Sequence, residues 1–199
     1  MKRVVVLATI AFGLLSSTAM ANTITVSPSP IITGGGPYTW SYSVTLDGNS
    51  QISNGDFFTI FDFAGYVAAS QNAPAGWTPS TSNTGVCPAA APFPTLCAAV
   101  DDPAITNLTW TRTGGTIAGA GFAGGTVALG NFTAQSIFNV PVNDFFTSQD
   151  DDLQTGTMNE GAGGNTNVPI APVPEPASLL LLGSGLVAAA ARARRKARQ

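Results

Sequence analysis

Few residue types in this chain could carry out catalysis. The sequence contains no histidine, and Arg112 is the only basic residue between positions 22 and 173. Ser–His and Cys–His nucleophile systems need an imidazole base, and Schiff-base chemistry needs a lysine, so residues 22–173 can support neither. The remaining possibility is acid–base chemistry by two carboxylates, as in glycoside hydrolysis.

The spacing of the aspartates does not favour such a pair. Asp56 and Asp62 are six residues apart on one predicted strand, which separates them by about 20 Å. Asp101 and Asp102 precede Pro103, a pattern typical of a turn. We therefore predict that the protein is not an enzyme, and a carboxylate-based hydrolase is kept as an alternative.

The run Asp150-Asp151-Asp152 could offer oxygen ligands to Ca²⁺, together with Asp144 and Glu160. Its spacing differs from that of an EF-hand loop, which alternates acidic residues and has glycine at its sixth position. A run of like charges is more often a solvated surface. We predict no metal site and no cofactor, and calcium binding at this run stays open.

Three tryptophans, Trp40, Trp77 and Trp110, could stack on sugar rings if their side chains were exposed. A carbohydrate-binding module is therefore an alternative function. The aromatic run over residues 56–66 is more typical of a protein core, because phenylalanine has no polar group with which to orient a ligand.

The N-terminus has the three parts of a signal peptide. Lys2 and Arg3 are positive, residues 4–15 are apolar, and Ala19-Met20-Ala21 fits the small-x-small cleavage pattern. We predict a signal peptide over residues 1–21, with Ala19 and Ala21 defining the cleavage site.

The C-terminal segment, residues 173–199, also has three parts: the triplet Pro174-Glu175-Pro176, an apolar run over residues 177–191, and a basic tail. The run would form a helix of about 22 Å, short for a membrane span, and basic residues favour the cytoplasmic side. The sequence predicts a short transmembrane helix that anchors the chain transiently. The predicted anchor residues are Leu179, Leu180, Leu181, Leu182, Leu186 and Val187, and the tail contains Arg192, Arg194, Arg195, Lys196 and Arg198.

Between these ends the chain is acidic. Residues 22–173 contain ten acidic residues and one arginine, a net charge of −9, whereas the whole chain has −3. Nucleic-acid phosphates are bound by Lys and Arg, so we expect no nucleic-acid partner. Cys87 and Cys97 are the only cysteines, and in an exported chain this even number predicts a disulfide across a proline-rich loop.

The hydrophobic pattern predicts an all-β domain over residues 22–158, an antiparallel β-sandwich with jelly-roll-like topology. Residues 38–47 alternate cleanly between apolar and polar, residues 56–66 are apolar on both faces, and residues 105–112 alternate again. Arg112 is expected to pair with a carboxylate. Residues 73–94 are predicted to form a long loop.

Residues 126–133 and 137–146 are predicted to form a closing hairpin, with Phe138, Val140 and Val142 facing inward. Gly130 would mark a bulge, and Pro141 would place its strand at a sheet edge. Residues 159–172, rich in glycine and asparagine, are predicted to be a polar linker to the anchor.

The C-terminal segment resembles the PEP-CTERM sorting signal of Gram-negative bacteria. The resemblance covers about 27 of the 199 residues: Val173-Pro174-Glu175-Pro176-Ala177-Ser178, the apolar run and the arginine-rich end. It implies recognition by an exosortase, a membrane-embedded protease-transpeptidase, with cleavage near the triplet. It also implies transfer to the outer surface or to the exopolysaccharide matrix.

Proteins with this signal share a sorting route rather than a molecular function. We therefore expect an exported cell-surface or extracellular-matrix protein of a Gram-negative bacterium, structural or adhesive in an exopolysaccharide biofilm. The expected partners are the exosortase, the inner membrane during transient anchoring, and exopolysaccharide. The carbohydrate-binding module and the hydrolase remain the alternatives.

Overall fold

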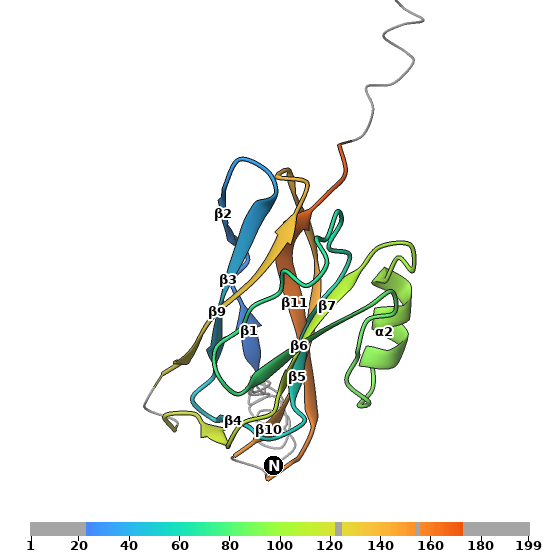
Figure 1. Cartoon of the computed structure of the whole chain (residues 1–199). Coiled ribbons are helices and arrows are strands. Elements are labelled where there is room, and N and C mark those ends of the chain that lie inside the picture. The colour runs from blue at the N-terminus through green and yellow to red at the C-terminus, as the bar shows by residue number, and fades with distance from the viewer. Residues whose placement is uncertain (1–22, 122–124, 154–155, 173–199) are drawn as a thin grey trace, which may run out of the picture.

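The structure is a computed structural model that describes residues 23–121, 125–153 and 156–172. These residues fold as an all-β sandwich of two antiparallel sheets, with one short helix in this part of the chain (Figure 1). The predicted fold class, an antiparallel β-sandwich, is confirmed. The signal helix and the C-terminal transmembrane helix that the sequence predicts lie outside the described residues.

The smaller sheet is organised around β3 (Tyr38–Leu46). One edge of β3 pairs with β1 (Ile24–Val26) and β2 (Ile31–Thr33), and the other edge pairs with β9 (Val127–Ser136). The alternation predicted for β3 is confirmed, because its even-numbered residues from Trp40 to Leu46 are all buried. An alternating strand of this kind covers one face of a core.

The larger sheet contains, in spatial order, β6 (Trp77–Ser82), β7 (Asn107–Arg112), β5 (Phe57–Ile60) and β10 (Pro141–Asp152). Strand β11 (Glu160–Pro169) pairs with the edge of β10 that faces away from β5. Two short strands, β4 (Ser50–Ile52) and β8 (Ile117–Ala118), extend the sheet beside the C-terminal end of β10. All four residues of β5 are buried, which confirms the central position predicted from its two apolar faces.

Aromatic rings from both sheets form the centre of the core. The ring of Phe58 stacks on Trp110 with a centroid distance of 5.1 Å, and it meets Phe132 edge-on at 4.9 Å. Trp77 also meets Phe132 edge-on, at 5.1 Å. Contacts of these two geometries each contribute about 0.5–1.5 kcal/mol beyond the area that they bury.

The outer face of the larger sheet is covered by helix α2 (Phe93–Val100) and the loop that precedes it (Figure 1). The predicted Cys87–Cys97 disulfide is present and ties this loop to α2. The predicted loop over residues 73–94 is wrong in part, because Trp77–Ser82 forms β6 and α2 begins at Phe93. Pro94 lies in the first turn of α2, where its missing N–H costs no hydrogen bond.

The predicted closing hairpin is wrong. Strand β9 pairs with β3 in one sheet, whereas β10 pairs with β5 and β11 in the other. Residues 137–140 carry the chain between the sheets, and Val140 is 47% exposed rather than inward-facing. Pro141 does not mark an edge strand, since it is the first residue of β10, a position that tolerates proline. Alternation predicts which face is buried, but it does not identify the pairing partner.

The predicted linker over residues 159–172 is also wrong, because residues 160–169 form β11. Its ten residues pair with β10 from Pro141↔Pro169 to Asp150↔Glu160. The glycines that suggested a linker are needed for packing. A Cβ atom at Gly161 would lie 2.6 Å from the Phe93 ring, and one at Gly163 would lie 2.7 Å from the Phe145 ring. The folded domain therefore extends at least to Pro169 instead of ending at residue 158.

Within the described residues, Arg112 bonds to backbone carbonyl groups instead of the expected carboxylate. Its guanidinium donates hydrogen bonds to the carbonyl oxygens of Ala75, Gly76 and Gly115, and it lies 5.7 Å from the centroid of the Trp77 ring. The side chain is only 8% exposed. Arg112 thus joins the β5–β6 connection to the turn after β7, because a buried guanidinium needs several acceptors at once.

The predicted bulge at Gly130 is confirmed. The register between β3 and β9 shifts where Val44↔Gly130 is followed by Thr45↔Ala128, so Leu129 has no partner on β3. Gly130 has a φ of +110°, a backbone conformation that only glycine adopts without strain.

Replacing Gly130 with alanine should destabilise the protein by about 1–3 kcal/mol, because the new Cβ would be strained at this φ and would lie 2.8 Å from Pro74. Gly115→Ala is the matched control, since a Cβ there meets nothing within 4 Å. Urea unfolding measures both variants, and equal stabilities would contradict the strained bulge.

Candidate functional site

The tryptophans that could have formed a sugar-binding platform are buried. Trp40 and Trp110 are fully buried, and Trp77 is 7% exposed. The indole N–H of Trp40 donates to the carbonyl oxygen of Phe138, at 3.1 Å, inside the fold. Stacking on a sugar requires an accessible ring face, so the exposed tryptophan on which the carbohydrate-binding alternative depends is not found here.

The run Asp150–Asp152 is not a solvated surface, because all three residues are buried at the C-terminal end of β10. Asp150 has the same side-chain parity as Phe146 and Ser148, which face the sandwich interior, and it lies directly opposite Glu160 of β11. Both carboxylate oxygens of Asp150 are buried without a hydrogen-bond partner, as is the hydroxyl of Ser50.

Burial is the main reason why the pKa of Asp150 rises from its ordinary value of 3.8 to about 7. The nearby Ser50 hydroxyl has the second largest effect and lowers the pKa, although it lacks the geometry of a hydrogen bond. The negative charges of Asp56, Glu160 and Asp151 raise the pKa further. This carboxyl is therefore largely protonated in the folded protein below about pH 7.

The acidic neighbours of Asp150 hold loops in place. Asp56 accepts a hydrogen bond from the backbone N–H of Ser53, at 2.6 Å. Asp151 accepts hydrogen bonds from the Ser53 hydroxyl and from the backbone N–H of Asn159. These contacts fasten the β4–β5 turn and the start of β11 to the end of β10, which is a structural role.

A second acidic cluster lies where β5, β7 and α2 meet. The carboxylate of Asp62 accepts a hydrogen bond from the backbone N–H of Asp102, and the Asp62 N–H donates to the side-chain oxygen of Asn107. Burial is the first reason that the pKa of Asp62 is raised to about 6, and the nearby charges of Asp144, Asp101 and Asp102 add to it. Asp62 also has a positive φ of 52°.

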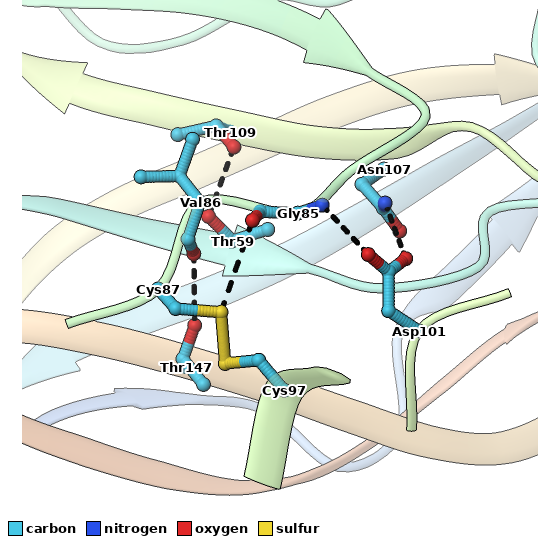
Figure 2. Close-up of a disulfide and its surroundings, with 9 residues drawn as sticks. All are labelled: Thr59, Gly85, Val86, Cys87, Cys97, Asp101, Asn107, Thr109 and Thr147. Atoms are coloured by element: carbon cyan, nitrogen blue, oxygen red, sulfur yellow. Dashed lines mark hydrogen bonds between the residues drawn. A yellow bond between two sulfur atoms is a disulfide. The ribbon is translucent and has the colours of Figure 1, made fainter. Parts of the chain in front are cut away.

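The remaining contacts of this cluster are structural (Figure 2). The carboxylate of Asp101 accepts from the amide of Asn107 at 2.7 Å and from the backbone N–H of Gly85 at 3.0 Å. The second acidic cluster thus holds the disulfide loop and the end of α2 against β7. The fold brings Asp62 next to Asp102. Asp56 lies in the first cluster instead, so Asp56 and Asp62 belong to different clusters.

Neither cluster is arranged as a metal site. Among residues 23–121, 125–153 and 156–172, no group of three or more acidic or cysteine side chains is positioned to hold an ion. The calcium alternative at Asp150–Asp152 therefore has no ligand set in the described residues.

The chain leaves the sandwich directly from its last strand. Val168 is fully buried in the core. The N–H of Ala64 donates to the carbonyl oxygen of Pro169, and the N–H of Ile170 donates to the carbonyl oxygen of Val140. Ala171 and Pro172 are exposed. Figure 1 shows this exit at the end of the sandwich that also carries the β2–β3 turn. Three residues, 171–173, therefore lie between Ile170, the last residue of the described part with a backbone hydrogen bond to the body, and Pro174.

The comparison with known families concerns the segment that follows this exit. The family model of the PEP-CTERM protein-sorting motif matches residues 172–196. The chain carries a PEP-CTERM sorting motif. The motif is that of an exported protein processed by an exosortase, and the match includes the triplet, the apolar run and the tail as far as Lys196. No curated protein matches the chain.

The residues predicted to act in sorting lie outside the described residues. This applies to Pro174, Glu175 and Pro176, to the anchor over residues 177–191, to the basic tail, and to Ala19 and Ala21 of the signal peptide. Within the described ranges, no helix combines the length and the apolar character that crossing a bilayer requires.

The sequence interpretation missed two features of these sites. One is the burial of Asp150, which the alternation Phe146, Ser148, Asp150 could have indicated if β10 had been extended past residue 146. The other is the short exit, which was hidden because the glycines of β11 are typical of a linker.

Asp150→Asn should make stability less dependent on pH. The folded-state pKa of Asp150 is raised, so the folded protein favours the protonated carboxyl. The contribution of this group to the free energy of unfolding is therefore fully present below pH 4 and is lost as pH rises through about 7. The variant should be more stable than the parent at pH 8, by on the order of 3 kcal/mol, and similar at pH 4.

Urea unfolding across this pH range measures the effect of Asp150→Asn. Asp47→Asn is the control, because it removes one charge while keeping an acceptor for the backbone N–H of Asn49. If the free energy of unfolding of Asp150→Asn depended on pH as that of the parent does, ionising Asp150 would not destabilise the fold, and the raised pKa would be contradicted.

Collisional quenching of tryptophan fluorescence by acrylamide should be weak in the folded protein and should rise strongly on unfolding, since all three indoles are buried. Equally strong quenching of the folded and the urea-unfolded protein would contradict the buried positions and would restore a possible stacking surface.

Proposed function

We propose that the protein is a non-catalytic component of the cell surface or extracellular matrix. In this proposal the C-terminal segment anchors the precursor in the inner membrane until an exosortase cleaves near Pro174–Pro176. The β-sandwich is then the part that the cell keeps outside, where it acts as a structural or adhesive protein in exopolysaccharide.

The observation that carries this proposal is the position of the sorting motif relative to the fold. Strand β11 ends at Pro169, and among the described residues Ile170 makes the last backbone hydrogen bond to the body. Cleavage near the triplet would thus leave β11 and the described core residues intact. A sorting signal that is cut off must lie outside the domain that it delivers, and this triplet begins five residues after β11 ends.

Three features of the body support an extracellular, non-catalytic role. The Cys87–Cys97 disulfide suits an oxidising compartment. Four of the clustered carboxylates accept hydrogen bonds from backbone N–H groups or polar side chains of the fold, namely those of Asp56, Asp151, Asp62 and Asp101. Strand β6 presents exposed residues from Thr78 to Ser82, a polar edge able to hydrogen-bond with sugar hydroxyls.

Mass spectrometry of the protein from cell envelope and medium tests the processing step. With an active exosortase, the exported form should start at Asn22 and lack the basic tail, so its mass should correspond to a chain ending near the triplet. Replacing Pro174, Glu175 and Pro176 with alanine should leave the tail in place.

Ala171→Ser is the matched control for the triplet, since it changes an exposed residue just before the matched motif. Processing of this variant should be normal. An intact C-terminus on the unaltered protein in cells with a working exosortase would overturn the proposed processing.

A further inference from the structure

The end of the sandwich from which the chain exits has no charged side chains in the segments that form it. These segments are the β2–β3 turn (residues 34–38), residues 64–66, the crossing between sheets (residues 137–141) and the exit itself (residues 169–172). Ile137 is 60% exposed here and Val140 is 47% exposed. We call these four segments the exit end.

Two exposed aliphatic side chains next to the chain exit need an explanation, because their apolar area faces water in the free domain. Both belong to the crossing between sheets, and this crossing is held firmly. The N–H of Ile137 donates to the carbonyl oxygen of Gly65, and the carbonyl oxygens of Phe138 and Val140 accept from Trp40 and Ile170. The two side chains are thus presented on a fixed backbone.

The length of chain between the exit and the apolar run indicates that the exit end faces the membrane. From Ile170, the last residue of the described part with a backbone hydrogen bond to the body, seven residues lead to Ala177, where the apolar run of the matched sorting motif begins. Seven fully extended residues span about 25 Å at most. While this run is anchored, which is part of the proposed function, the exit end must stay close to the membrane surface.

The charge distribution favours the same orientation. Asp150 and Glu160 pair at the opposite end of the β10–β11 ladder from Pro141 and Pro169, nine residue steps or about 30 Å away. The acidic residues nearest to the exit end in sequence are Asp62, two positions before Ala64, and Asp144, three positions beyond Pro141, and both belong to the second acidic cluster. An anionic bilayer repels carboxylates, so the uncharged end can approach it at lower cost than the end that carries Asp150 and Glu160.

We propose that the exit end is a membrane-docking surface that rests on the outer leaflet of the inner membrane while the precursor is anchored. Ile137 and Val140 enter the interfacial region of the bilayer, where apolar side chains gain by leaving water. The acidic residues around Asp150 point away from the lipid. This arrangement holds the triplet at the membrane surface, within reach of a membrane-embedded protease.

Tryptophan probes in the anchored precursor test this surface. The precursor from cells without exosortase is reconstituted into phosphatidylethanolamine–phosphatidylglycerol vesicles that contain brominated lipid, which quenches tryptophan only at short range. Val140→Trp places a probe at the exit end. Leu153→Trp is the matched control at the opposite end, because Leu153 is 46% exposed against 47% for Val140.

The Val140→Trp precursor should lose a larger fraction of its fluorescence to brominated lipid than the parent, and Leu153→Trp should behave like the parent. Ile137→Trp provides a second probe at the exit end if Val140→Trp folds poorly. Adding Ile137→Asp to Val140→Trp should reduce the quenching, since a charge opposes entry into the interface.

Equal quenching of Val140→Trp and Leu153→Trp, in a precursor that still floats with the vesicles, would overturn the docking surface and leave the proposed anchoring intact. Unchanged quenching after Ile137→Asp would also overturn it, because the short connection alone would then hold the end near the lipid. A precursor that does not float with vesicles would overturn the anchoring and the docking together.

Discussion

The pairing of β11 with β10 is the interaction on which the rest of this structure depends. It adds the final strand to the larger sheet, buries Val168 in the core and fastens the end of the domain to the crossing between sheets. It also places Glu160 opposite Asp150, so two carboxyl groups face each other at one end of the ladder. Like charges in such a pair are unfavourable, and the charge of Glu160 is one reason why the pKa of Asp150 is raised.

The outer face of the larger sheet shows how polar strand residues can be buried without loss. Thr59 and Thr109 bond to each other at 2.9 Å, and Thr147 donates to the carbonyl oxygen of Val86 in the disulfide loop. The disulfide and α2 hold this loop over the sheet, and the glycines of β11 leave room for the ring of Phe93. Because these hydroxyl groups form hydrogen bonds, the fold avoids the free-energy cost of leaving buried polar groups unpaired.

The two ends of the sandwich differ in chemistry, and the sorting motif lies beyond the uncharged one. The buried carboxyl of Asp150 lies near the other end, together with the acidic residues that hold its loops. This difference follows from the antiparallel direction of β10 and β11, because Asp150 faces Glu160 at one end of the ladder and Pro141 faces Pro169 at the other. In the proposed docking, the exit end faces the membrane and the end that carries Asp150 and Glu160 faces away from it.

The sequence by itself determined the features that depend on local patterns. The alternation of β3, the two apolar faces of β5, the bulge at Gly130, the disulfide and the sorting motif could all be predicted, since each is encoded within a short stretch or by a residue type. Strand pairing could not be predicted, because β9 and β10 are neighbours in sequence but belong to different sheets. The glycines of β11 resembled a linker until Phe93 and Phe145 were seen to pack against them. The burial of the tryptophans and of Asp150, and the short distance from the fold to the triplet, were decided only by tertiary structure, because each depends on strands brought together from distant parts of the chain.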